Sequence, residues 1–139
     1  MSIGSILMTK VFGCIWLCHN YTIDPVLFAG HYNGIKGYSA NTDSLLTTSG
    51  KPEYMDATYK DLLYLRQVYH KGVAVLNIYG DIGNGSDERV YNNSSKSLKY
   101  LVVNGRSYQE VKIKGAKGQH SQLHESRKVD RAMQKFLWN

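Results

Sequence analysis

The pair Asn104-Gly105, between two stretches of alternating apolar and polar residues, constrains the fold of this chain more than any other feature. Asn-Gly in such a setting is the strongest short-range signal for a β-hairpin with a type I′ turn. The pattern predicts that Leu98–Val103 and Arg106–Lys114 pair as antiparallel strands, with Lys99 opposite Glu110. The apolar face of that hairpin would be formed by alternate residues, namely Leu98, Tyr100, Val102, Val111 and Ile113.

The rest of the chain supplies further strands and two helices. Apolar and β-branched runs predict strands at Ile6–Cys18, with a break at Gly13, at Val26–Ala29 and at Val73–Tyr79. Start and stop residues predict a helix over Glu53–His70, preceded by Pro52, and an apolar stripe predicts a last helix over His120–Trp138. A length of 139 residues suits one domain. We therefore expect a single α+β domain, residues 1–139, with an antiparallel sheet, a middle helix and a C-terminal amphipathic helix packed on the sheet.

Positive charge is concentrated in the C-terminal third. Residues 1–95 contain seven Lys and Arg and eight Asp and Glu, a net charge of −1, whereas residues 96–139 contain ten and three, a net charge of +7. Such asymmetry points to an anionic partner, with nucleic acid ahead of a membrane surface. A basic solvated face that serves only solubility is the alternative explanation.

The predicted last helix separates apolar from cationic residues. On a helical wheel, one half is apolar: Leu123, Val129, Ala132, Met133, Phe136 and Leu137. The other half and the residues just before the helix form a cationic stripe, which we assign as the nucleic-acid-binding surface: Lys112, Lys114, Lys117, His120, His124, Arg127, Lys128, Arg131 and Lys135. The sequence thus predicts a small basic protein that binds RNA in preference to DNA, alone or as a component of a ribonucleoprotein or virion.

Two other functions remain open at this point. His31, in a loop rich in glycine, together with His120 or His124, would provide a base and an acid for metal-free RNA cleavage, as in a ribonuclease or toxin. The basic stripe would equally suit a protein–protein module with an acidic partner. In the leading interpretation no residue is catalytic. We predict no metal and no cofactor, because His120 and His124 lack a third ligand and have cationic neighbours.

The remaining motifs carry less weight. Gly80–Ser86 lacks the lysine of a P-loop and the third glycine of a dinucleotide fingerprint, so it predicts a turn. Cys14 and Cys18 would lie about 13 Å apart on one strand, too far for a disulfide, which favours a cytoplasmic protein. Four Asn-x-Ser/Thr sequences keep secretion as the minor alternative. No run is long enough to span a bilayer, and the pattern does not set the oligomeric state.

Overall fold

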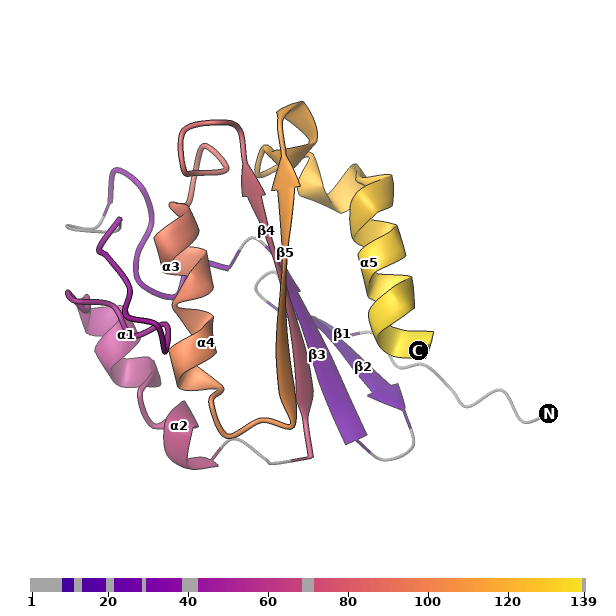
Figure 1. Ribbon diagram of the computed structural model, residues 1–139, viewed down its shortest axis with the longest axis horizontal. Helices are drawn as coiled ribbons and strands as arrows, with labels where there is room; N and C mark the ends of the chain where they lie inside the picture. The colour runs from indigo at the N-terminus through magenta and orange to yellow at the C-terminus, as the bar shows by residue number, and fades with distance from the viewer. Residues whose placement is uncertain are drawn as a thin grey trace.

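The computed structural model of the protein describes residues 9–11, 14–19, 22–28, 30–38, 43–68 and 72–138. The strands in these ranges are β1 (Thr9–Val11), β2 (Cys14–His19), β3 (Thr22–Phe28), β4 (Ala74–Asp81) and β5 (Ser107–Lys114). The helices are α1 (Ala57–Leu62), α2 (Leu65–Val68), α3 (Asn92–Lys96), α4 (Leu98–Leu101) and α5 (Arg127–Trp138), with 3-10 turns η1 (Ala116–Gly118) and η2 (Leu123–Glu125). Helices cover both faces of one twisted sheet (Figure 1).

The sheet has the order β1-β2-β3-β4-β5, and its pairing changes at β3. β1, β2 and β3 are antiparallel, whereas β4 is parallel to both β3 and β5. The chain crosses from β4 to β5 through α3 and α4, which is the βαβ connection that parallel neighbours require. The predicted α+β domain with an antiparallel sheet is therefore wrong: the strands between the helices are parallel, as in an α/β fold.

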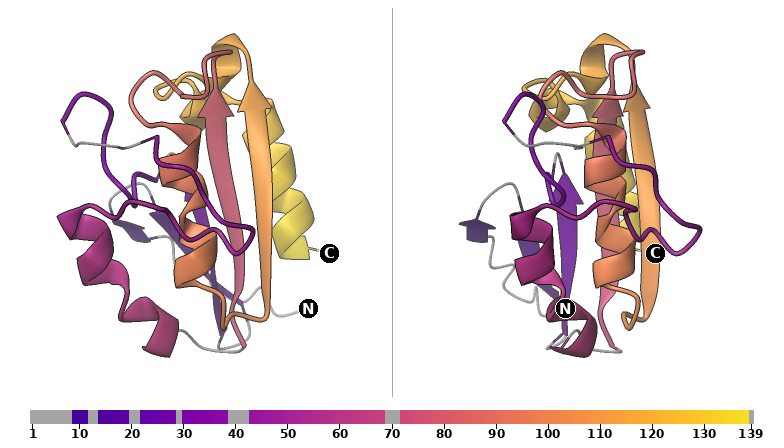
Figure 2. Two further views of the ribbon diagram at one scale, coloured as in Figure 1. Left: turned by 60° about the vertical axis from the view of Figure 1, so that its left-hand side comes forward. Right: turned by 90° about the vertical axis from the view of Figure 1, so that its left-hand side faces the viewer.

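Strand β4 lies between β3 and β5, and both of its faces are covered. Leu76 and Ile78 pack on the side of α5, in a cluster that includes Val26 of β3. Val75 packs on the other side with Leu101 of α4. Figure 2 shows α5 on one side of β4 and β5 and the pair α3 and α4 on the other. The predicted strand at 73–79 is thus confirmed, and it is buried on both faces.

The predicted hairpin does not form. Leu98, Leu101 and Val102 are all buried, and their i, i+3, i+4 spacing places them on one face of a helical segment. A strand would have turned Leu101 away from the other two. Asn104 and Gly105 lie in the connection from α4 to β5, so Lys99 and Glu110 are not a cross-strand pair. β5 instead pairs with β4, with Ala74 beside Ser107 and Asp81 beside Lys114.

Both predicted helices are shorter than expected. The region predicted at 53–70 contains α1 and α2, and α1 begins after Asp56, whose carboxylate accepts the Tyr59 N–H at 2.7 Å. The predicted last helix begins at Arg127 rather than at His120, because the preceding residues form η1, η2 and turns. The apolar side of α5 packs on the sheet as the helical wheel predicts, through Val129, Ala132, Met133, Phe136 and Leu137.

The predicted N-terminal strand at 6–18 corresponds to β1 and β2, and residues 1–8, 12 and 13 lie outside the described ranges. The predicted strand at 26–29 is the end of a longer strand, β3, and residue 29 also lies outside those ranges. None of the described helices is long and apolar enough to cross a membrane.

Candidate active site

Two loops meet at the carboxyl ends of the parallel strands. Loop 82–91 follows β4 and carries Asp87, and the segment after β5 carries His120. Because β4 and β5 are parallel and in register, both loops leave the sheet at the same edge (Figure 2). In open α/β sheets, functional groups gather in the crevice outside the carboxyl ends of the strands.

Asp87 and His120 are joined by a side-chain hydrogen bond. Oδ2 of Asp87 lies 2.7 Å from Nδ1 of His120, and the Asp87 side chain is 3% exposed whereas that of His120 is 33% exposed. The second carboxylate oxygen, Oδ1, accepts the main-chain N–H groups of Arg89 at 2.9 Å and Val90 at 2.7 Å. The carboxylate is thus buried, fully hydrogen-bonded and directed at one ring nitrogen.

This arrangement sets the tautomer of His120. A carboxylate accepts hydrogen bonds only, so Nδ1 must carry the proton that it shares with Asp87. In the neutral ring Nε2 is then left as the basic nitrogen, with its lone pair available. A histidine oriented in this way by a buried carboxylate is the general base of acyl-transfer enzymes.

Main-chain and side-chain contacts hold the two loops together. The His120 N–H donates to the Asp87 carbonyl at 2.8 Å, and Nε2 of Gln119 donates to Oε2 of Glu88 at 2.5 Å. Glu88 has φ 88°, a conformation that costs a non-glycine residue about 1–3 kcal/mol. Such strain persists where surrounding contacts enforce it, and here it lies next to the buried carboxylate.

Two glycines let the His120 segment approach the sheet. A Cβ on Gly80 would lie 1.8 Å from the Gly118 carbonyl oxygen, and a Cβ on Gly118 would lie 2.1 Å from the Ile113 carbonyl oxygen. Backbone therefore packs directly on backbone here, two residues before His120. No residue with a side chain fits either position without moving the loop.

Of the histidines selected from the sequence, the structure gives His120 a charged partner, but a different one from that predicted. His120 was predicted to act with His31, but its Nδ1 is hydrogen-bonded to Asp87, a residue that the sequence reasoning missed. His31 lies exposed in the turn region after β3, and His124 is exposed in η2. The structure therefore gives no support to the proposed ribonuclease pair of His31 with His120.

The predicted cationic stripe is only partly continuous. Arg127, Lys128, Arg131 and Lys135 are all exposed on α5. Lys112 does not lie with these four residues. Its ammonium group pairs with the Asp81 carboxylate near α3, on the other face of the sheet. Lys114 and Lys117 are exposed, whereas His120 and His124 precede the helix rather than lying on it. Within the described ranges, no cluster of three His, Cys, Asp or Glu residues could hold a metal ion.

The fold and the position of the Asp–His pair resemble those of the α/β-hydrolase class. In that class the acid and the histidine follow successive strands in the chain order nucleophile, acid, histidine, and Asp87 precedes His120 in this way. Residues 23–139 match the family described as alpha/beta hydrolase of unknown function (DUF915), and the chain belongs to that family.

A solved structure shows the same fold. The lin2722 gene product of Listeria innocua superposes with a TM-score of 0.68 at 19% sequence identity. The match covers 81% of this chain and 44% of the Listeria protein, so this chain spans less than half the length of that relative. None of the curated proteins is similar enough in sequence to match.

Family membership overturns the predicted function. A hydrolase fold with a buried Asp–His pair replaces the expected small RNA-binding protein, and nothing supports a place in a ribonucleoprotein or virion. The cations of α5 are a property of one helix surface, and their contact with a polyanion remains a prediction that the structure does not test.

A signal for the acid was present in the sequence. The run at 74–79, apolar except for Asn77, is typical of a parallel strand covered on both faces. The loop that follows such a strand is where catalytic residues gather, and it contains Asp87 just after the Gly80–Ser86 motif. The motif itself predicted only a turn, because it lacks the lysine of a P-loop and the third glycine of a dinucleotide fingerprint.

Proposed function

We propose that this chain provides the acid–base pair of a hydrolase that cleaves an acyl bond, with His120 as general base and Asp87 as the residue that orients it. The observation that carries the proposal is the 2.7 Å contact between the buried Asp87 carboxylate and Nδ1 of the half-exposed His120. Nε2 would accept the proton of the attacking hydroxyl group and return it to the leaving group. Asp87 would stabilise the imidazolium that forms between the two steps.

In the α/β-hydrolase arrangement the nucleophile is a serine at the end of an earlier strand. Within the described ranges, no hydroxyl or thiol group hydrogen-bonds to the ring of His120. The pair is chemically able to activate either a hydroxyl group or a water molecule.

The test is hydrolysis of 4-nitrophenyl acetate and butyrate by the full chain. His120→Ala removes the base and should lower kcat/KM by about 10²–10⁴-fold. Asp87→Asn keeps the shape but favours the wrong tautomer, and a loss of up to about 10⁴-fold is expected. His31→Ala is the matched control, since His31 is an exposed loop histidine outside the pair and its loss should leave the rate unchanged. Native hydrolysis no faster than that of His120→Ala would contradict the proposal.

A further inference from the structure

The carboxylate of Asp81 lies where β4 ends and the loop with Asp87 begins. Its Oδ1 accepts the main-chain N–H of Gly83 at 2.9 Å and that of Gly85 at 3.1 Å. Both glycines have positive φ, 110° and 74°, a region that side chains disfavour. These two conformations turn the N–H groups of both glycines toward one oxygen atom, so the first half of the loop wraps around the carboxylate.

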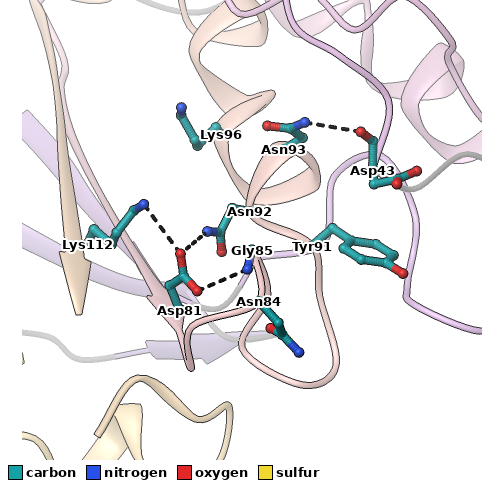
Figure 3. Close-up of a pocket in the computed structure, with 9 residues that line it drawn as sticks. All are labelled: Asp43, Asp81, Asn84, Gly85, Tyr91, Asn92, Asn93, Lys96 and Lys112. Atoms are coloured by element: carbon teal, nitrogen blue, oxygen red, sulfur yellow. Dashed lines mark hydrogen bonds and ion pairs between the residues drawn. The ribbon is translucent and has the colours of Figure 1, made fainter. Parts of the chain in front are cut away.

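The second oxygen joins the loop to two further elements. Oδ2 of Asp81 accepts hydrogen bonds from Nδ2 of Asn92 in α3 at 2.8 Å and from Nζ of Lys112 in β5 at 3.4 Å (Figure 3). The Asn92 N–H in turn donates to the Gly85 carbonyl at 2.8 Å, which closes the loop at its far end. One carboxylate therefore connects β4, both ends of the loop, α3 and β5.

The four hydrogen-bond donors around Asp81 stabilise its charged carboxylate form. Burial acts to raise the pKa of Asp81, but the hydrogen bonds from Gly83, Asn92, Gly85 and Lys112 outweigh it and hold that pKa below its usual value. The side chain is 15% exposed, at a polar pocket of about 400 Å³ that also includes Asp43 and Lys96. An asparagine would be isosteric but would place an NH₂ group against a donor on one side.

Hydrogen bonds rather than apolar packing fix the first half of the loop: besides the contacts of Asp81, the Ile82 N–H donates to the Ser86 carbonyl at 2.9 Å, and the Ser86 hydroxyl donates to Oδ1 of Asn84 at 2.8 Å. Residues 82–85 are all exposed, and burial begins at Ser86 and Asp87. Apolar packing therefore cannot hold the start of the loop, and hydrogen bonds must do so. The next turn contains the strained Glu88, which needs the flanking backbone to be held in place.

We propose that Asp81 is a positioning residue for the acid–base pair: it fixes loop 82–91 so that the Asp87 carboxylate stays directed at Nδ1 of His120. The inference rests on the proposed function. It assigns Asp81 no contact with substrate or with the reacting atoms, since its carboxylate acts through the loop backbone.

The experiment compares Asp81→Asn with Asp43→Asn in the full chain. Asp43 lines the same pocket, and its described contact is the hydrogen bond that its main-chain oxygen accepts from Asn93. NMR spectra of ¹⁵N-histidine-labelled protein follow the hydrogen-bonded Nδ1 proton of His120, and circular dichroism verifies folding. In Asp81→Asn we expect that proton to exchange with solvent at least about tenfold faster, and kcat on the ester probe to fall by up to about 100-fold with KM little changed. Asp43→Asn should behave like the native chain.

A folded Asp81→Asn protein with the native Nδ1 signal and native kcat would overturn the inference. If that variant does not fold, Asn92→Ala and Lys112→Met each remove one donor to Oδ2 and leave the glycine contacts. Faster exchange of the His120 proton in both supports positioning, and native exchange in both overturns it. A native chain without esterase activity would contradict the proposed function alone, because the exchange measurement does not depend on turnover.

Discussion

Replacing Leu101 with alanine distinguishes the helix α4 from the hairpin that the sequence suggests. Leu101 is 0% exposed and packs with Tyr59, Val75 and Leu98. Transfer of a buried leucine side chain is worth about 1.5–3 kcal/mol, and the cavity left behind raises the cost of Leu→Ala to about 2–5 kcal/mol. Alanine is only slightly the better helix former. We expect the free energy of unfolding to fall by about 3 kcal/mol.

Val103→Ala is the control, because Val103 is 52% exposed in the turn after α4. Its cost should stay within about 0.5 kcal/mol. Urea titrations followed by circular dichroism at 222 nm measure both values, with the slope against urea expected to be the same as that of the native chain. In the predicted hairpin Leu101 and Val103 would share the face of Lys99, away from the core. Equal costs for the two substitutions would therefore refute the helical packing.

Two further predictions concern the glycine contact and the buried tyrosines. Gly118→Ala should displace the His120 segment and lower kcat/KM on the ester probe by about 100-fold. Gly72→Ala is the control and should have no effect, because a Cβ at that position meets nothing within 4 Å. Native activity in Gly118→Ala would rule out the tight contact. Burial, with smaller effects of Glu110 and Asp81, raises the pKa of Tyr79 to about 12 from the ordinary 10.0. The unfolded chain therefore loses this proton first, and the free energy of unfolding should fall as pH rises from 10 to 12. Urea titrations across that range should show a shallower fall for Tyr79→Phe, and an identical fall would contradict the assignment.

Local patterns in the sequence were enough to place several elements. The apolar side of α5 follows a period of 3.6 residues, and the structure buries that side from Val129 to Leu137. The apolar run at β4 was long enough to identify a strand, because its residues are buried whichever neighbours it pairs with. The segment Gly80–Ser86 was predicted as a turn, and the chain bends at residues 82–85, after β4 ends at Asp81.

The same patterns could not decide which strands pair. Leu98, Tyr100 and Val102 fit a strand, whereas Leu98, Leu101 and Val102 fit a helix, and both sets occur in the same five residues. The choice depends on Tyr59, which lies about 40 residues earlier, is fully buried against Leu98 and Leu101, and donates its hydroxyl proton to the Ser97 carbonyl at 2.7 Å. A contact between such distant residues leaves no mark on local periodicity.

The sequence by itself therefore determined which residues are apolar enough to be buried and that α5 is amphipathic. Only the tertiary structure decided that β4 and β5 are parallel, and with it the candidate site. Parallel pairing brings both carboxyl ends to one edge of the sheet, so that Asp87 and His120, 33 residues apart in sequence, lie 2.7 Å from each other. An antiparallel pairing of the same strands would have placed the two loops at opposite edges.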